Sequence, residues 1–177
     1  MKQQQIYNLE EFANKYQLTN TFGAYAAYFS VGIILTEETD VAQHFKEMML
    51  QRTLFTKMLL VKQGTAKVHI SEHDTPKTLT PDCLLAMTSK HIITEAEFSP
   101  DFAAECLLVD SEMVSDNTIY RLHAEKHKSV SDIFSMIHNI VKHQHINKIE
   151  MIESMFNVLR LILEELPYEQ CSISHDF

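Results

Sequence analysis

Two hydrophobic patterns divide the chain near residue 128. From residue 25 to about residue 109, apolar residues come in short runs, of which the clearest are residues 31–35, 54–61, 66–70, 83–87 and 104–109. In the third run, Ala66, Val68 and Ile70 alternate with polar neighbours, which is the period of a half-buried strand. Short strands at this spacing predict that the segment is all β and folds as a sandwich or small barrel.

Turn signals separate these predicted strands. Residues 62–64 (Lys-Gln-Gly) lie between two apolar runs and predict a tight hairpin turn, in which Gly64 takes a positive φ. Residues 74–76 (Asp-Thr-Pro) and 80–82 (Thr-Pro-Asp) predict the next two turns.

After Lys128 the apolar residues follow a helical period. Val130, Ile133, Phe134, Ile137, Ile140 and Val141 predict a first helix, with Ser129 or Ser131 as its N-cap. Residues 143–147 interrupt the pattern. A second helix is expected from about Lys148 to Leu166, where Pro167 ends it.

The second helix carries more apolar surface than one barrel needs. Its two apolar rows cover roughly half of the circumference, whereas a helix on one surface needs an arc of about 100°. The excess is covered either by the preceding helix or by a second subunit, and the spacing of 3 and 4 favours a subunit interface. The residues assigned to this interface are Ile152, Met155, Phe156, Leu159, Ile162 and Leu163.

Composition and charge narrow the class of protein. The 177 residues are 45% hydrophobic and 22% charged, which suits one globular domain. Fifteen Lys and Arg against 24 Asp and Glu give a net charge of −9, which opposes direct binding to DNA. We see no secretory signal or membrane span, and three widely spaced cysteines indicate a reducing, cytoplasmic location. Ile6, Leu9 and Phe12 suggest an N-terminal arm over the barrel mouth or a frayed terminus.

The sequence offers no catalytic constellation. There is no GxSxG elbow, and Gly23, Gly32 and Gly64 belong to no phosphate-binding loop. Ten histidines suggest metal, but the pairs His69 and His73, and His123 and His127, lack the rest of a ligand set. We therefore expect no enzyme, no bound metal and no cofactor.

A pocket between the predicted sheets is the more plausible site, because small β-barrels can hold one ligand. Lys57 and Arg52 stand beside strand residues where a polar ligand group would need a cation, although a solvated position is the simpler expectation for each. For the apolar positions the alternative is a dry core. The residues assigned to the pocket are Met58, Leu60, Met87, Thr88, His91, Ile93 and Cys106.

The order of these parts resembles the sensing domain of AraC-type transcriptional regulators. Gly64 matches the first glycine of that family's pattern, residues 80–82 stand where Pro-Gly-Asp is usual, and residues 83–87 match the apolar strand that follows. Residues 131–166 look like the family's two following helices, the second of which is its dimerisation helix. The resemblance extends from about Phe45 to Pro167.

The resemblance implies a cupin-like β-sandwich or jelly-roll barrel followed by an antiparallel helix pair. The expected parts are a sensing domain at 1–128 with an N-terminal arm, a dimerisation segment at 129–168, and a tail or linker at 169–177. The implied function is ligand sensing and homodimerisation by a cytoplasmic regulator, with an unknown small-molecule effector. Nothing here resembles the family's helix-turn-helix region of about 100 residues, so that region is expected beyond Phe177.

Two other classes of protein stay open. A cyclic-nucleotide-type sensor also joins a β-roll to a long helix, but its Gly-Glu phosphate cassette is missing here. A stand-alone cupin enzyme would need a bound metal. A further alternative is a complete short protein that pairs with a full-length regulator through the helix.

Overall fold

The computed structural model describes residues 6–32, 39–70, 75–88, 93–111, 113–114 and 118–170. Its helices are α1 (Leu9–Lys15), α2 (Thr39–Leu50), α3 (Ala124–Lys142) and α4 (Lys148–Glu164). Its first strands are β1 (Ile6–Tyr7), β2 (Thr21–Phe22), β3 (Ala26–Val31), β4 (Arg52–Thr53), β5 (Thr56–Gln63) and β6 (Ala66–Ile70). They are followed by β7 (Lys77–Leu79), β8 (Cys83–Met87), β9 (Ile93–Phe98), β10 (Ala103–Val109), β11 (Thr118–Arg121) and β12 (Tyr168–Gln170).

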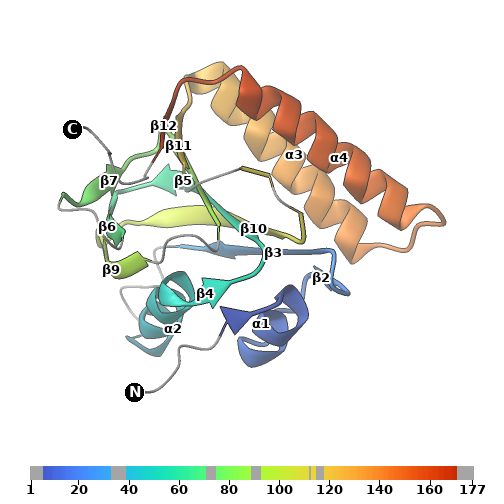
Figure 1. Cartoon of the computed structure of the whole chain (residues 1–177), viewed down its shortest axis with the longest axis horizontal. Helices are drawn as coiled ribbons and strands as arrows, with labels where there is room; N and C mark the ends of the chain where they lie inside the picture. The colour runs from blue at the N-terminus through green and yellow to red at the C-terminus, as the bar shows by residue number, and fades with distance from the viewer. Residues whose placement is uncertain are drawn as a thin grey trace, which may run out of the picture.

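The strands form an open β-sandwich (Figure 1). One sheet has the order β12-β11-β8-β5-β10-β3-β2, and the facing sheet has the order β7-β6-β9. Leu59, Val61 and Leu85 of the large sheet share a buried core with Val68 and Ile70 of the small one. The mainly β fold followed by two C-terminal helices confirms the predicted fold class.

The predicted turn at residues 62–64 joins two sheets and does not close a hairpin. β5 pairs with β8 and β10 in the large sheet, whereas β6 pairs with β7 and β9 in the small one. Gly64 does have the expected positive φ, of 73°. A Cβ at this position would lie 2.4 Å from the hydroxyl of Ser99 and 2.9 Å from the backbone of Phe102. The glycine therefore allows both the backbone turn and the close approach of a neighbouring loop.

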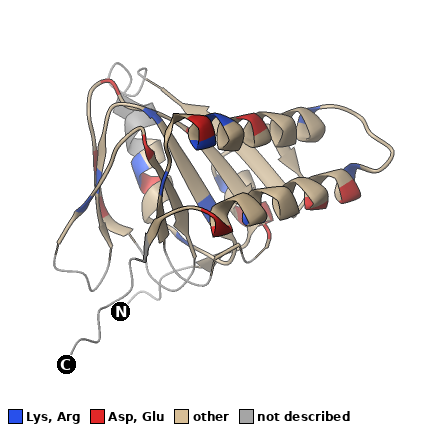
Figure 2. Cartoon of the chain, turned by 90° about the horizontal axis from the view of Figure 1, so that it is seen from above, with Lys and Arg blue, Asp and Glu red and all other residues tan. Residues whose placement is uncertain are grey.

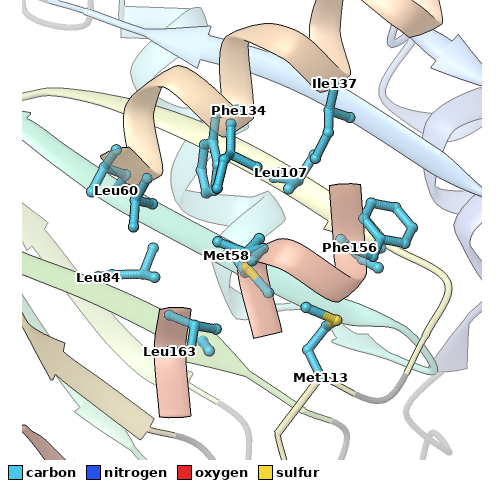
Figure 3. Close-up of a cluster of buried hydrophobic side chains, with 14 of the residues drawn as sticks. Met58, Leu60, Leu84, Leu107, Met113, Phe134, Ile137, Phe156 and Leu163 are labelled. Atoms are coloured by element: carbon cyan, nitrogen blue, oxygen red, sulfur yellow. The ribbon is translucent and has the colours of Figure 1, made fainter. Parts of the chain in front are cut away.

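The two C-terminal helices lie antiparallel on the outer face of the large sheet (Figure 1). Side chains alternate along β5, so Met58 and Leu60 point to the helices while Leu59 and Val61 point to the other sheet. Figure 3 shows Phe134 of α3 and Leu163 of α4 around Leu60 and Leu84 of the sheet. A second core between sheet and helices is the result.

Helices α3 and α4 follow the predicted pattern, with one difference. α4 begins at Lys148 as expected, but α3 begins at Ala124 and not near Ser129 or Ser131. His123 is its N-cap residue and makes no capping hydrogen bond with its side chain. The additional first turn carries few apolar residues, so the hydrophobic period did not reveal it.

Helix α2 corrects the prediction that residues 25–109 are all β. It buries Phe45, Met48 and Met49, which are three and four residues apart and so share one helix face. The run is short, and its apolar residues lie between predicted strands. That position made the segment look like part of the β pattern.

The N-terminal segment is a packed helix in the part that the structure describes. Asn8 caps α1 through a capping box with Glu11, and the helix buries Leu9 and Phe12. β1 pairs in parallel with β4 beside it. No helix among the described residues is long and apolar enough to cross a membrane.

Candidate functional site

The described residues that were predicted to line a pocket between the sheets are divided between two cores. Met58 and Leu60 belong to the core under the helices, whereas Met87, Ile93 and Cys106 belong to the core between the sheets. Thr88 is half-buried at the end of β8, and His91 lies outside the described residues. The space that Met58, Met87 and Cys106 line together has a volume of about 10 Å³, which holds about one water molecule.

A larger cavity lies at one end of the sandwich, between α1, α2 and β3. Its volume is about 360 Å³. The lining is almost entirely apolar or aromatic and consists of Tyr16, Leu18, Phe29, Val31, His44, Phe45 and Met48. We call this the α1–α2 cavity.

Aromatic rings form much of its wall. Tyr16 meets His44 edge to face with 4.7 Å between ring centroids, and Phe29 meets Phe45 at 6.4 Å. Phe29 and Val31 are only half-buried although both are apolar, because their side chains border this space. A cavity of this size with few polar groups suits a small apolar ligand.

The polar groups at the mouth of the cavity already have partners. The Tyr16 hydroxyl donates to Glu47 at 3.4 Å, and Lys15 lies 3.6 Å from the same carboxylate. Burial and the nearby carboxylate of Glu47 raise the pKa of Tyr16. The tyrosine is therefore a neutral hydrogen-bond donor at physiological pH.

Lys57 is buried, contrary to the solvated position expected from the sequence. The residue is 6% exposed, and its ammonium donates to the carbonyl oxygens of Met48, Met49 and Gln51 at 3.4, 3.4 and 2.8 Å. These carbonyls lie at the C-terminal end of α2, where a cation compensates the helix dipole. Burial lowers the pKa of Lys57 to about 7. Arg52, the other cation considered, is half-buried.

A polar network joins α3 to the large sheet, on the face opposite the α1–α2 cavity. The Tyr28 hydroxyl donates to Glu105 at 3.1 Å, and the Ser131 hydroxyl donates to the same carboxylate at 3.0 Å. Lys62 donates to Ser131 at 2.8 Å. The Tyr28 ring stacks on the imidazole of His138, with 4.4 Å between centroids. We call these five residues the Glu105 network.

The predicted interface residues on α4 divide into two groups. Ile152, Phe156, Leu159 and Leu163 are buried against the sheet and α3 within the protomer, so in this fold they are not available to a partner. Met155 and Ile162 are partly exposed. The prediction favoured a second subunit as the cover of the apolar arc beyond about 100°. In the protomer the four buried residues share one core with the sheet and α3, the preceding helix that the sequence analysis named as the alternative.

Apolar residues nevertheless reach the outer surface of the helix pair. Residues 133–141 of α3 and 154–159 of α4 contain no Lys, Arg, Asp or Glu. In Figure 2 the blue Lys and Arg and the red Asp and Glu of these helices lie mostly toward the helix ends. Within this charge-free belt Met136 is 49% exposed and Val158 is 41% exposed. Leu161 continues the exposed surface on the next turn, at 59%.

The histidines considered as metal ligands have other neighbours. The His127 ring contacts the Val61 carbonyl oxygen at 3.0 Å. His73 lies outside the described residues. Within the described ranges, no three His, Cys, Asp or Glu side chains are grouped so as to hold a metal ion.

Comparison with solved structures found chains of limited similarity. The structure of the AraC-like transcriptional activator CuxR is similar, with a TM-score of 0.49, 8% identity, and coverage of 84% of this chain and 52% of CuxR. An apo form of a ToxT variant from Vibrio cholerae gives 0.42 and 10%, covering 59% and 45%. A further ToxT structure gives 0.40 and 12%, covering 63% and 48%.

This chain spans about half the length of those solved proteins. No family model matches the chain, and no curated protein sequence matches it.

The sequence contained a signal for the α1–α2 cavity that the β interpretation obscured. Two of its lining residues, Phe45 and Met48, are three residues apart, which places them on one face of a short helix. This face meets Tyr16 and Leu18 only because α1 and α2 pack on the same end of the sandwich. That packing is a tertiary property.

Proposed function

We propose that this chain is the ligand-sensing and dimerisation domain of an AraC-like transcription regulator, with the α1–α2 cavity as its effector site. One observation carries the proposal: the cavity and the helix pair lie on opposite faces of the same strand, β3. Phe29 of β3 lines the cavity, and the preceding residue, Tyr28, contacts α3. Only the thickness of β3 thus separates a ligand on one face from the helices on the other face.

The proposed role is binding and not catalysis. The cavity wall offers aromatic rings and aliphatic side chains, while its hydroxyl and carboxylate neighbours are engaged with one another. The one imidazole of the wall, His44, stands edge to face against the Tyr16 ring, and the lining brings no second catalytic group beside it. The proposal therefore includes that the chain is not an enzyme.

Thermal unfolding in the presence of a small-molecule library tests the effector site. We expect an apolar or aromatic compound to raise the Tm, and we expect Phe45→Ala to reduce that rise when each variant is compared with its own ligand-free Tm. Cyclic nucleotides and metal analysis of untagged protein belong in the same experiment. A Tm rise with cyclic nucleotide, or a stoichiometric metal, would replace this proposal with one of the other two classes.

The homodimer is proposed to form through the charge-free belt. Met136 and Val158 are large apolar side chains that are exposed in the protomer, and burial of such side chains against a second copy would stabilise association. Met155 and Ile162, which the sequence analysis assigned to the interface, border the same surface. The four buried residues contribute by holding α4 in place.

Light scattering at tens of micromolar protein tests the dimer. We expect a dimer for the wild type and a monomer for Val158→Glu, since a carboxylate would have to be buried without a partner. Ile146→Glu is the matched control, because Ile146 is fully exposed in the loop between the helices. A monomeric wild type refutes the dimer, and an equal effect of both substitutions refutes this surface.

DNA contact is assigned to a helix-turn-helix region outside the 177 residues, and the cytoplasm is the proposed location. The net charge of −9 supports a separate basic DNA-binding part, and the free thiols of Cys83 and Cys106 are compatible with a reducing compartment. Reading the gene beyond the codon for Phe177 tests the assignment. About 100 further residues, basic overall and with two helix-turn-helix patterns, are expected. An immediate stop codon would contradict the assignment.

A further inference from the structure

The Glu105 network lies on the face of β3 and β10 that α3 covers, opposite the cavity side of β3. In the β3–β10 register, Phe29 pairs with Cys106 and Tyr28 pairs with Leu107. Side chains alternate across a strand, so Phe29 points to the cavity side, while Tyr28 and Glu105 point to α3. A displacement of either strand on one side is therefore transmitted directly to the other.

The contacts between α3 and these strands differ along the helix. Most of the buried face of α3 is apolar, with Val130, Phe134 and Ile137 packed on the sheet. Apolar contacts are not directional, and they tolerate small shifts. The bonds of Ser131 and Tyr28 to Glu105, at 3.0 and 3.1 Å, depend on distance and angle. The network is thus the part of the interface that responds to a small movement of β3 or β10.

We propose that the Glu105 network couples occupancy of the α1–α2 cavity to the packing of α3 on the large sheet. This inference rests on the proposed function and names how the effector site is read out. An occupant that separates Phe29 from Phe45 shifts β3, and the shift lengthens the hydrogen bonds of Tyr28 and Ser131 to Glu105. The outer surface of the helix pair then changes, which alters the dimer interface.

Linkage makes the coupling reciprocal. If an occupied cavity changes the dimer affinity by some factor, dimerisation changes the ligand affinity by the same factor. Position between two sites is not in itself evidence of coupling, so the test must measure an energetic response at α3. A large side chain introduced at the cavity wall can serve as the occupant, so the test does not require the effector to be known.

The test uses the substitutions Leu18→Trp and Val31→Trp, which bring an indole to the cavity wall from two sides. The chain has no tryptophan, so the emission of the introduced indole reports directly whether it is shielded from water. Leu54→Trp is the matched control, because Leu54 is 64% exposed and lies outside the cavity lining. Hydrogen exchange of the backbone amides of residues 131–138 reports how firmly α3 is packed on the sheet.

We expect these α3 amides to exchange about fivefold faster when the indole fills the cavity, the factor for losing roughly one hydrogen bond. Leu54→Trp should leave them unchanged. In the Glu105→Gln background the cavity substitutions should have no further effect. The background Asp132→Asn, which makes the same chemical change at the exposed Lys128–Asp132 pair of α3, should keep the full response.

Two results would overturn the coupling: a shielded indole with unchanged α3 exchange, or a response that persists fully in Glu105→Gln. An indole that stays in water at both positions would overturn the cavity itself, and with it the proposed function. A library ligand that raises the Tm without changing α3 exchange would leave the effector site standing while refuting the coupling. The two failures are thereby distinguishable.

Discussion

Replacing Lys57 by methionine tests whether a buried ammonium ion holds the end of α2. Among the described residues, Lys57 is the only lysine or arginine that is buried. Its three hydrogen bonds go to carbonyl oxygens of Met48, Met49 and Gln51, which would otherwise end the helix without partners. Methionine keeps most of the length and the apolar part of the side chain but removes the charge and the donors.

The expected effect is a change in how stability depends on pH. Burial lowers the pKa of Lys57 from 10.5 to about 7 in the folded protein. Between these two values the unfolded chain binds one more proton than the folded one, so the free energy of unfolding rises with pH. The buried charge lowers the free energy of unfolding by its full amount below pH 7, and this destabilisation disappears as the pH approaches 10.5. The slope is about 1.4 kcal/mol per pH unit for one proton.

Urea unfolding between pH 7.5 and 9 measures this slope. We expect the wild type to gain about 2 kcal/mol relative to Lys57→Met over that interval. Lys67→Met, on the exposed face of β6, is the control and should run parallel to the wild type. Parallel curves for the wild type and Lys57→Met would refute the reasoning, because the lysine would then have the same pKa in both states.

Three further substitutions test the packing, each by urea unfolding. Gly64→Ala should cost about 2 kcal/mol or more, because alanine meets both the positive φ and a crowded neighbour; a cost below about 0.5 kcal/mol would contradict that crowding. Leu159→Ala should cost about 2–5 kcal/mol and Leu54→Ala less than about 0.5 kcal/mol, since only Leu159 is buried; equal costs would show that α4 is not packed on the sheet. Asn8→Ala should cost about 1 kcal/mol through loss of the α1 cap, and unchanged stability would show that the cap is not needed.

Local periodicity explains why much of the fold was predictable. Alternation over residues 66–70 and the apolar run at 83–87 correspond to β6 and β8, and the 3–4 spacing after residue 128 corresponds to α3 and α4. A strand or helix needs one face compatible with burial, and that requirement is written in neighbouring residues. The helix ends were marked by the interruption of the apolar pattern at residues 143–147 and by Pro167, which has no backbone N–H and disfavours helix at the residue before it.

The candidate site was much less predictable. Met58, Leu60, Met87, Ile93 and Cys106, which were assigned to the pocket, are all buried, but a sheet that is covered on both sides has two buried faces. Met58 faces the helices and Met87 faces the second sheet. The cavity instead lies where α1 and α2 meet β3, and α2 was not recognised. Its lining residues come from three separate segments of the chain.

The sequence by itself determined strands β6 and β8, helices α3 and α4, the turn at Gly64 and the apolar character of α4. These are local properties, set by side-chain period, backbone preference and composition. Only the tertiary structure decided that Gly64 connects two sheets, that Lys57 is buried under α2, and which parts of α4 face the protomer core. Those outcomes depend on what lies against each surface, and a surface can be covered by any segment of the chain whose shape and polarity fit it.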